Sequence, residues 1–170
     1  SLHGTFSNTP AALLGVKNPN PRRGDLTMHL DLAIRDTRMF GPVVEVRRRI
    51  ACTLGQPEIQ IHDEVTNIGD TPVPHHWLYH VNLGYPLVDA GARFVYRGRI
   101  VSDWAQGDRR SAPGWQGDKT LPGGLPEHAG IGERGISMDP DSDDAGVCDV
   151  GVVNSARGLA FALSYPKNQL

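Results

Sequence analysis

Hydrophobic and polar residues alternate with a period of two along three consecutive stretches, 26–36, 43–54 and 58–69. The apolar members of the three stretches are, in order, Leu26, Met28, Leu30, Leu32 and Ile34, then Val44, Val46, Ile50, Cys52 and Leu54, then Ile59, Ile61 and Val65. This alternation is typical of strands with one buried face. Short turns rich in Gly, Pro, Asn and Asp separate the stretches, so we expect three antiparallel neighbours.

One charged residue interrupts the apolar positions of the second stretch. Arg48 falls on the apolar face, between Arg47 and Arg49 on the other face. A solvated strand is the interpretation we favour for these arginines. The formal net charge of -2 and the sequence pI of about 6.4 also argue against nucleic acid as a partner.

The rest of the chain also favours strands. Period-two patterns predict strands over 75–85 and 92–98, and a hairpin over 149–165 with its turn at 155–158. Between them, the stretch from about 103 to 146 loses the pattern and is rich in Gly, Pro, Asp and Trp, which predicts a long irregular loop. We therefore expect an all-β chain, built as one large antiparallel sandwich domain over residues 1–170.

The composition agrees with an all-β chain and also suggests a cellular location. The chain has 170 residues with 20 Gly and 13 Pro, which suits a turn-rich β domain. Two cysteines far apart, Cys52 and Cys148, favour a reduced, cytoplasmic protein. No apolar run approaches the ~18 residues that cross a bilayer, so no membrane partner is expected. The absence of an initiator Met, and the end directly after a strand pattern, suggest a middle piece of a longer polypeptide.

The stretch 75–85 carries the most suggestive side chains. On a strand, one of its faces would consist of His76, Leu78, His80, Asn82 and Gly84. Such a polar stripe is costly to bury, so a concave, partly wet sheet face suits it better. Histidine titrates near neutrality, which makes His80 the best candidate for general acid–base work. A hydrogen-bonded structural histidine remains the alternative.

Metal and hydrolase chemistry find little support in the sequence. Four residues along a strand separate His76 and His80 by roughly 13 Å, whereas ligand atoms lie near 2 Å from a zinc ion. Asp63 and Glu64 are neighbours on a strand and face opposite ways, so they cannot act as a pair. The Asp-rich run 139–146 lacks the spacing of a calcium loop. We therefore expect no metal site.

Two motifs relate the chain to a known family. "LHGTFSNTPA" (2–11) and "LYHVNLGYPLVDAGARF" (78–94) resemble the aldose 1-epimerase family, and most of all an uncharacterised bacterial branch of it. The resemblance runs from Leu2 to Tyr165 and is weak across 103–146. It implies a galactose mutarotase-like β-supersandwich, of which residues 1–170 would form the central part. It also implies an enzyme that interconverts the α and β anomers of free sugars without a cofactor.

The same resemblance assigns roles to residues. The histidine of the first motif, His3, would bind and polarise the sugar, and His80 would be the general acid on the ring oxygen. Asn82 would lie beside His80 and contact the substrate. The family's base is a glutamate that nothing in 1–170 matches, so we expect the rest of the polypeptide to supply it and to complete the fold.

Two further residues are candidates for substrate binding. Glu133, in "GIGERGIS", resembles a stretch in which this branch carries a glutamate. Trp104 lies in the long loop, where an aromatic ring can stack on a sugar or, alternatively, anchor the loop.

Two other functions remain open at this point. The same kind of sandwich can serve as a non-catalytic carbohydrate-binding module, or as a different sugar enzyme, such as a lyase or an epimerase acting at another carbon. All three readings share a small-molecule sugar as the partner.

Overall fold

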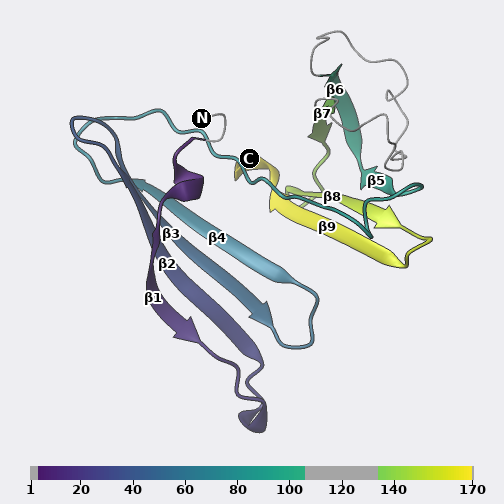
Figure 1. The fold of residues 1–170 in the computed structure, drawn as a ribbon, viewed down its shortest axis with the longest axis horizontal. Helices are drawn as coiled ribbons and strands as arrows, with labels where there is room; N and C mark the ends of the chain where they lie inside the picture. Colours follow the sequence, from purple (N-terminus) through teal and green to yellow (C-terminus); the bar gives the residue numbers. More distant parts are fainter. Residues whose placement is uncertain (1–3, 106–133, 170) are drawn as a thin grey trace. The chain divides into compact units, whose positions relative to one another are not determined.

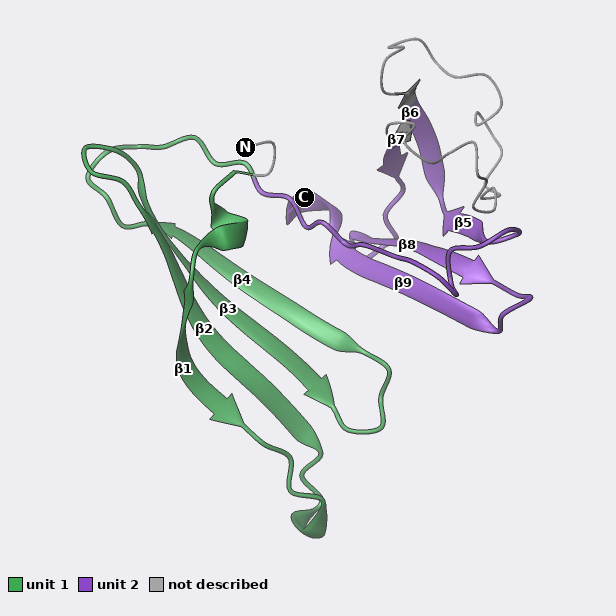
Figure 2. Ribbon diagram, in the orientation of Figure 1, with its two compact units in different colours: residues 1–76 green, residues 77–170 purple. Residues whose placement is uncertain are grey.

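The computed structural model describes residues 4–105 and 134–169, and these form an all-β protein. Strands hold 53% of the residues and helices 7%, which confirms the predicted fold class. The chain divides into two compact units, residues 1–76 and 77–170, and each is described by itself (Figure 2). The boundary lies inside the stretch 75–85 that the sequence pattern treated as one strand. That both units belong to a single domain stays a prediction.

Unit 1 contains a four-stranded antiparallel sheet in the order β1-β2-β3-β4 (Figure 1). Its strands are β1 (Ala11–Lys17), β2 (Thr27–Thr37), β3 (Val43–Thr53) and β4 (Ile59–Asn67). The last three are the strands that the alternating pattern predicts, and they are antiparallel neighbours as expected. Two 3-10 helices, η1 (Phe6–Asn8) and η2 (Pro21–Arg23), flank β1.

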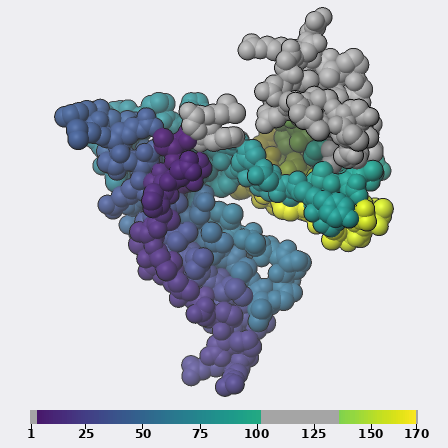
Figure 3. Space-filling view, in the orientation of Figure 1, coloured from purple at the N-terminus to yellow at the C-terminus, as the bar shows by residue number. Residues whose placement is uncertain are grey.

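β1 is an edge strand that the alternating pattern did not reveal. Leu13 pairs with Leu32 of β2, but the next paired residue is Gly15, opposite Asp31, so Leu14 is an extra residue in a β-bulge. The bulge shifts the alternation by one residue. In the space-filling view β1 follows one border of unit 1, in purple (Figure 3). A strand that breaks its period in the middle gives no clean signal of period two.

The strand registers place the apolar side chains of β2, β3 and β4 on one face of this sheet. Ile34, Val46 and Val65 form one row across the three strands. Large apolar side chains of the sheet remain exposed, among them Leu13, Val16, Leu30, Ile59, Ile61 and Val65. Within residues 4–76 no second layer of strands covers this face.

Arg48 stands in the middle of the apolar face and is held there by an ion pair. Its register partner on β4 is Asp63, and the guanidinium donates two hydrogen bonds to the carboxylate, both 2.7 Å long. The Asp63 side chain is only 3% exposed. The expected solvated strand therefore describes Arg47 and Arg49, whose side chains are 62% and 55% exposed, and is wrong for Arg48.

Ion pairs also cover the opposite face. The buried carboxylate of Glu45 accepts hydrogen bonds from Arg35 Nε at 2.6 Å and Arg47 Nε at 3.0 Å. These bonds stabilise the charged form and lower the pKa of Glu45. Asp31 accepts two hydrogen bonds from Arg49, and its pKa is lowered for the same reason.

Unit 2 contains a three-stranded sheet and a two-stranded ribbon. The sheet has the order β5-β8-β9, with β5 (Arg93–Tyr96), β8 (Val147–Asn154) and β9 (Leu159–Pro166). The turn between β8 and β9 occupies 155–158, as predicted. Gly151 of β8 leaves no room for a side chain, because a Cβ there would overlap the carbonyl oxygen of Phe161. A 3-10 helix, η4 (Lys167–Gln169), follows β9.

The ribbon corrects the expected irregular stretch 103–146. β6 (Gly98–Ala105) continues into it, and β7 (Arg134–Pro140) pairs with β6. Ile136 and Met138 are half-buried and Ser137 is exposed, which is a period of two. That pattern covers too few residues to stand out from its Gly- and Asp-rich surroundings, so sequence reasoning missed the strand.

Candidate functional site

The segment that carries His80 and Asn82 is not a strand. Residues 72–84 lie outside every strand of the described structure, so the prediction of a strand over 75–85 is wrong. The alternation is present only in part, because Trp77, Tyr79 and Leu83 are half-buried and Leu78, His80, Asn82 and Gly84 are exposed, but Val81 is also exposed. The Trp77 and Tyr79 rings meet edge to face, with centroids 6.0 Å apart. Side-chain contacts such as the one between Trp77 and Tyr79 are present here, whereas pairing with a neighbouring strand is not.

His80 and Asn82 are both exposed, and so is Val81 between them. An imidazole and a carboxamide two residues apart are therefore both accessible to a small molecule. The imidazole can give or take a proton, and the carboxamide both donates and accepts hydrogen bonds.

Directly after Asn82 the chain is anchored to the core of unit 2. Ala92 and Val152 are buried, and Leu83, Leu87, Val88 and Phe94 pack against them. Two turns compact the segment, with the Val88 amide donating to Gly84 O at 2.9 Å and the Ala92 amide donating to Asp89 O at 3.0 Å. The packing explains why this part of the chain has a defined path without belonging to a sheet.

The last residue of β8, Asn154, and Arg157 of the following turn provide the polar anchors of the same segment. Asn154 is 1% exposed, and its Nδ2 donates to the carbonyl of Leu87 at 3.1 Å. Its Oδ1 accepts the backbone N–H of Arg157 at 3.2 Å. The Arg157 guanidinium donates to Asp89 Oδ2 at 2.7 Å and lies over the ring of Tyr85, 5.4 Å from its centroid.

Sequence reasoning missed these anchors. The bond from Arg157, together with the Ala90 amide, lowers the pKa of Asp89 and keeps the carboxylate charged. One local signal was available, since an Asn at the start of a tight turn is a common cap of that turn. Nothing in the sequence pairs that Asn with a carbonyl 67 positions earlier in the chain.

The structure gives no side-chain contacts for the other three predicted site residues, His3, Glu133 and Trp104. His3 and Glu133 lie outside the described residues. Trp104 was predicted in an irregular loop, but its backbone belongs to β6, opposite Gly135 of β7. The roles predicted for these three residues stay predictions.

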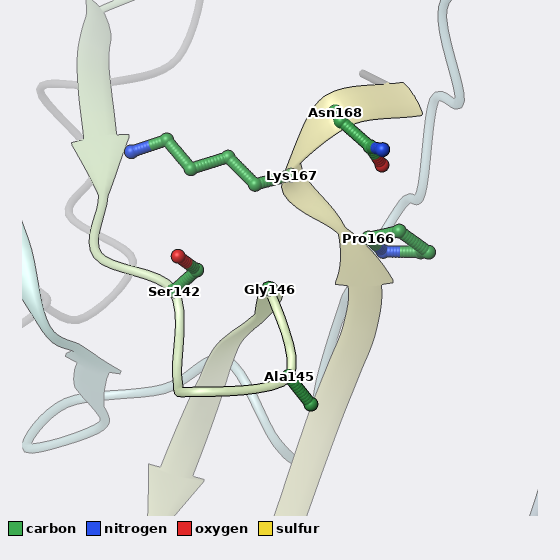
Figure 4. Close-up of a pocket in the computed structure, with 6 residues that line it drawn as sticks. All are labelled: Ser142, Ala145, Gly146, Pro166, Lys167 and Asn168. Atoms are coloured by element: carbon green, nitrogen blue, oxygen red, sulfur yellow. The ribbon is translucent and has the colours of Figure 1, made fainter.

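A cavity of about 340 Å³ lies elsewhere in unit 2 (Figure 4). It is lined by Ser142, Ala145, Gly146, Pro166, Lys167 and Asn168. The Lys167 ammonium extends toward the end of β7 and donates to Asp139 Oδ1 at 2.9 Å and to Pro140 O at 2.6 Å. Its bond to Asp139 lowers the pKa of that carboxyl and raises the pKa of Lys167. None of the predicted site residues lines this cavity.

The described residues contain neither a group of metal ligands nor a helix that could cross a membrane. Across 4–105 and 134–169, no three His, Cys, Asp or Glu side chains come together in a group that could hold a metal ion. The helices of these same ranges are all too short to cross a bilayer.

The described residues thus form an all-β protein with a candidate small-molecule site, the exposed His80 and Asn82, on a segment outside the strands. Residues 1–170 match the model of the family described as "Domain of unknown function (DUF4432)", and the chain belongs to this family. Comparison with curated proteins and comparison with solved structures gave no match.

Proposed function

We propose that this protein interconverts the anomers of a free sugar, with His80 as the general acid. The carrying observation is that His80 and Asn82, two residues apart, are both exposed while Leu83 directly after them packs against the core of unit 2. The resemblance to aldose 1-epimerases assigns both residues to the substrate. The proposal extends to the fold, as the central part of a galactose mutarotase-like supersandwich.

The reaction needs two proton transfers. The acid gives a proton to the ring oxygen while a base removes the proton of the anomeric hydroxyl, and the C1–O5 bond breaks to give the open aldehyde. Rotation about the C1–C2 bond followed by the reverse transfers closes the ring on the other face. Histidine suits the acid because an imidazole can both donate and accept a proton. Asn82 would orient a neighbouring hydroxyl by hydrogen bonding.

The base is proposed to be a glutamate outside residues 1–170, because no residue of this stretch matches the one that the resemblance assigns. His3, Glu133 and Trp104 complete the proposed substrate contacts. We place the enzyme in the cytoplasm, which suits the free thiols of Cys52 and Cys148.

The exposed apolar face of unit 1 supports a further part of this proposal. Burying apolar surface is worth about 25 cal/mol per Å², so a face of this kind favours a covering layer. We assign that layer to the rest of the same polypeptide. The full-length protein should then give no fluorescence enhancement with the dye ANS, and a strong enhancement from the folded protein would contradict this assignment.

Anomer exchange measured by NMR tests the function. The full-length protein is mixed with each of a panel of free aldoses, and exchange between the two anomeric signals is compared with the rate in buffer. Enhanced exchange that is lost in His80→Ala and kept in His62→Ala is expected. His62 is a fair control because it is an exposed histidine of β4, 3.6 Å from Glu64.

Two results would redirect the proposal. Binding of a sugar without enhanced exchange would favour a carbohydrate-binding module. No exchange and no binding with any sugar of the panel would remove the sugar as partner.

A further inference from the structure

The β8–β9 turn has a feature that its role as a hairpin connection does not require. Its two ends reach across to the segment that follows Asn82 and hold it at three residues, Tyr85, Leu87 and Asp89. A hairpin turn of four residues closes by its own backbone, and here the Arg157 and Gly158 amides donate to Asn154 O and Ser155 O at 3.2 and 3.3 Å. The additional contacts therefore serve the segment and not the hairpin.

We propose that Arg157 is a positioning residue, which fixes the place of His80 and Asn82 by clamping the segment after them; this inference rests on the proposed function. The guanidinium grips Asp89 by a charge-assisted hydrogen bond and Tyr85 by its position over the ring. Both gripped residues lie within nine positions of His80. Leu83, one residue after Asn82, packs against the same core as β8.

His80 and Asn82 lie outside the strands, so strand pairing does not set their positions. Contacts at Tyr85 and Asp89 restrict the path of the chain after Asn82 before the sugar arrives. Displacement of a reacting group by 1 Å can cost about 100-fold in rate.

The interaction is accessible to mutation without opening the core. The Arg157 side chain is about as exposed as that of Lys167, at 44% and 45%, while the buried anchor Asn154 remains in place when Arg157 is changed. Arg99 offers a matched control in the same unit. It also forms an exposed ion pair, with Asp139 at 3.1 Å, but on the β6–β7 ribbon.

The test compares Arg157→Ala, Arg157→Lys and Arg99→Ala in the full-length protein. For anomer exchange we expect Arg157→Ala to lower kcat about 10- to 100-fold with little change in KM, and Arg99→Ala to leave both unchanged. Arg157→Lys should recover most of the lost turnover, because an ammonium also pairs with Asp89. Equal kcat in Arg157→Ala and Arg99→Ala would overturn the inference.

A second readout separates this inference from the proposed function. In the NMR spectra, the His80 ring signals and the Asn82 side-chain amide signals should shift or broaden in Arg157→Ala and stay in place in Arg99→Ala. If the wild-type protein exchanges no sugar, the proposed function fails, and these signals alone decide whether Arg157 positions the two residues. Unchanged His80 and Asn82 signals in Arg157→Ala would refute the positioning role.

Discussion

The sheet of unit 1 and the segment 77–94 of unit 2 are both built from alternating residues, but different forces hold them. In the sheet, strand pairing fixes the backbone, and ion pairs lie on both faces. In the segment, no strand pairs with residues 77–84, and packing plus the contacts of Asn154 and Arg157 determine the path. A period of two therefore indicates that one side of the chain is apolar, and it does not say which contacts hold the chain in place.

The two regions also differ in what their polar side chains do. The charged groups of the sheet are nearly all committed to one another, as Arg48 is to Asp63. In the segment, His80 and Asn82 are exposed, and the contacts that anchor the chain follow them, at Leu83 and beyond.

The largest effect is expected at the buried ion pair of unit 1. Asp63→Ala removes the carboxylate that pairs with Arg48 on the apolar face, and removing one member of a buried pair costs about 3–5 kcal/mol of unfolding free energy. Urea unfolding measures it. Glu64→Ala, an exposed neighbour on the other face, should change the unfolding free energy by less than about 0.5 kcal/mol.

A paired replacement sharpens this prediction. Arg48→Met combined with Asp63→Leu should recover most of the loss, since apolar replacement of a whole buried pair is often neutral or stabilising. Equal small losses for Asp63→Ala and Glu64→Ala would show that the pair does not hold the sheet together.

An intermediate effect is expected at the polar anchor of the segment. Asn154→Ala removes the donor to Leu87 O and the acceptor of the Arg157 amide, which should cost about 1–3 kcal/mol. Amide hydrogen exchange should rise at Val88 and Ala92 and remain unchanged in β2 and β3. Uniform acceleration over both units, or none in the segment, would break the contrast drawn above.

The smallest effect on the free energy of unfolding is expected from lowering the pH. Hydrogen bonds from arginines lower the pKa values of Asp31, Glu45 and Asp89 from ordinary values of 3.8 for Asp and 4.5 for Glu. A carboxyl whose pKa is lower in the folded state stabilises the fold above its unfolded pKa, and this contribution disappears as pH falls through the folded pKa.

Unfolding free energy should therefore change little from pH 7 to about 5 through these groups and decline below about pH 4. Urea unfolding as a function of pH measures it, and Asp89→Asn should make the decline shallower. An identical slope in the variant and the wild type would show that Arg157 does not hold the Asp89 carboxylate in its charged form.

Much of unit 1 could be predicted from sequence, since β2, β3 and β4 each repeat their alternation over nine residues or more. The errors have local physical causes. β1 hides behind the bulge at Leu14, and β7 is too short to be recognised. The partner of Arg48 was also missed, because the pattern marked the arginine as an exception without indicating which strand supplies the carboxylate.

The candidate site was predictable in part. The exposure of His80 and Asn82 was expected from their spacing of two on a strand, but the segment is not a strand, and Val81 between them is exposed as well. The contacts of Asn154 and Arg157 with Leu87 and Asp89 were not predictable, because they join residues 67 and 68 positions apart. Such contacts depend on tertiary packing, to which a local pattern is blind.

A sugar site at His80 is tested by recording the histidine NMR spectrum of the full-length protein while a free aldose is added. We expect the His80 ring signals to move in a saturable way, while those of His62, on the sheet of unit 1, stay in place. Movement of neither residue with any aldose, or equal movement of both, would contradict a sugar site on the segment that carries His80.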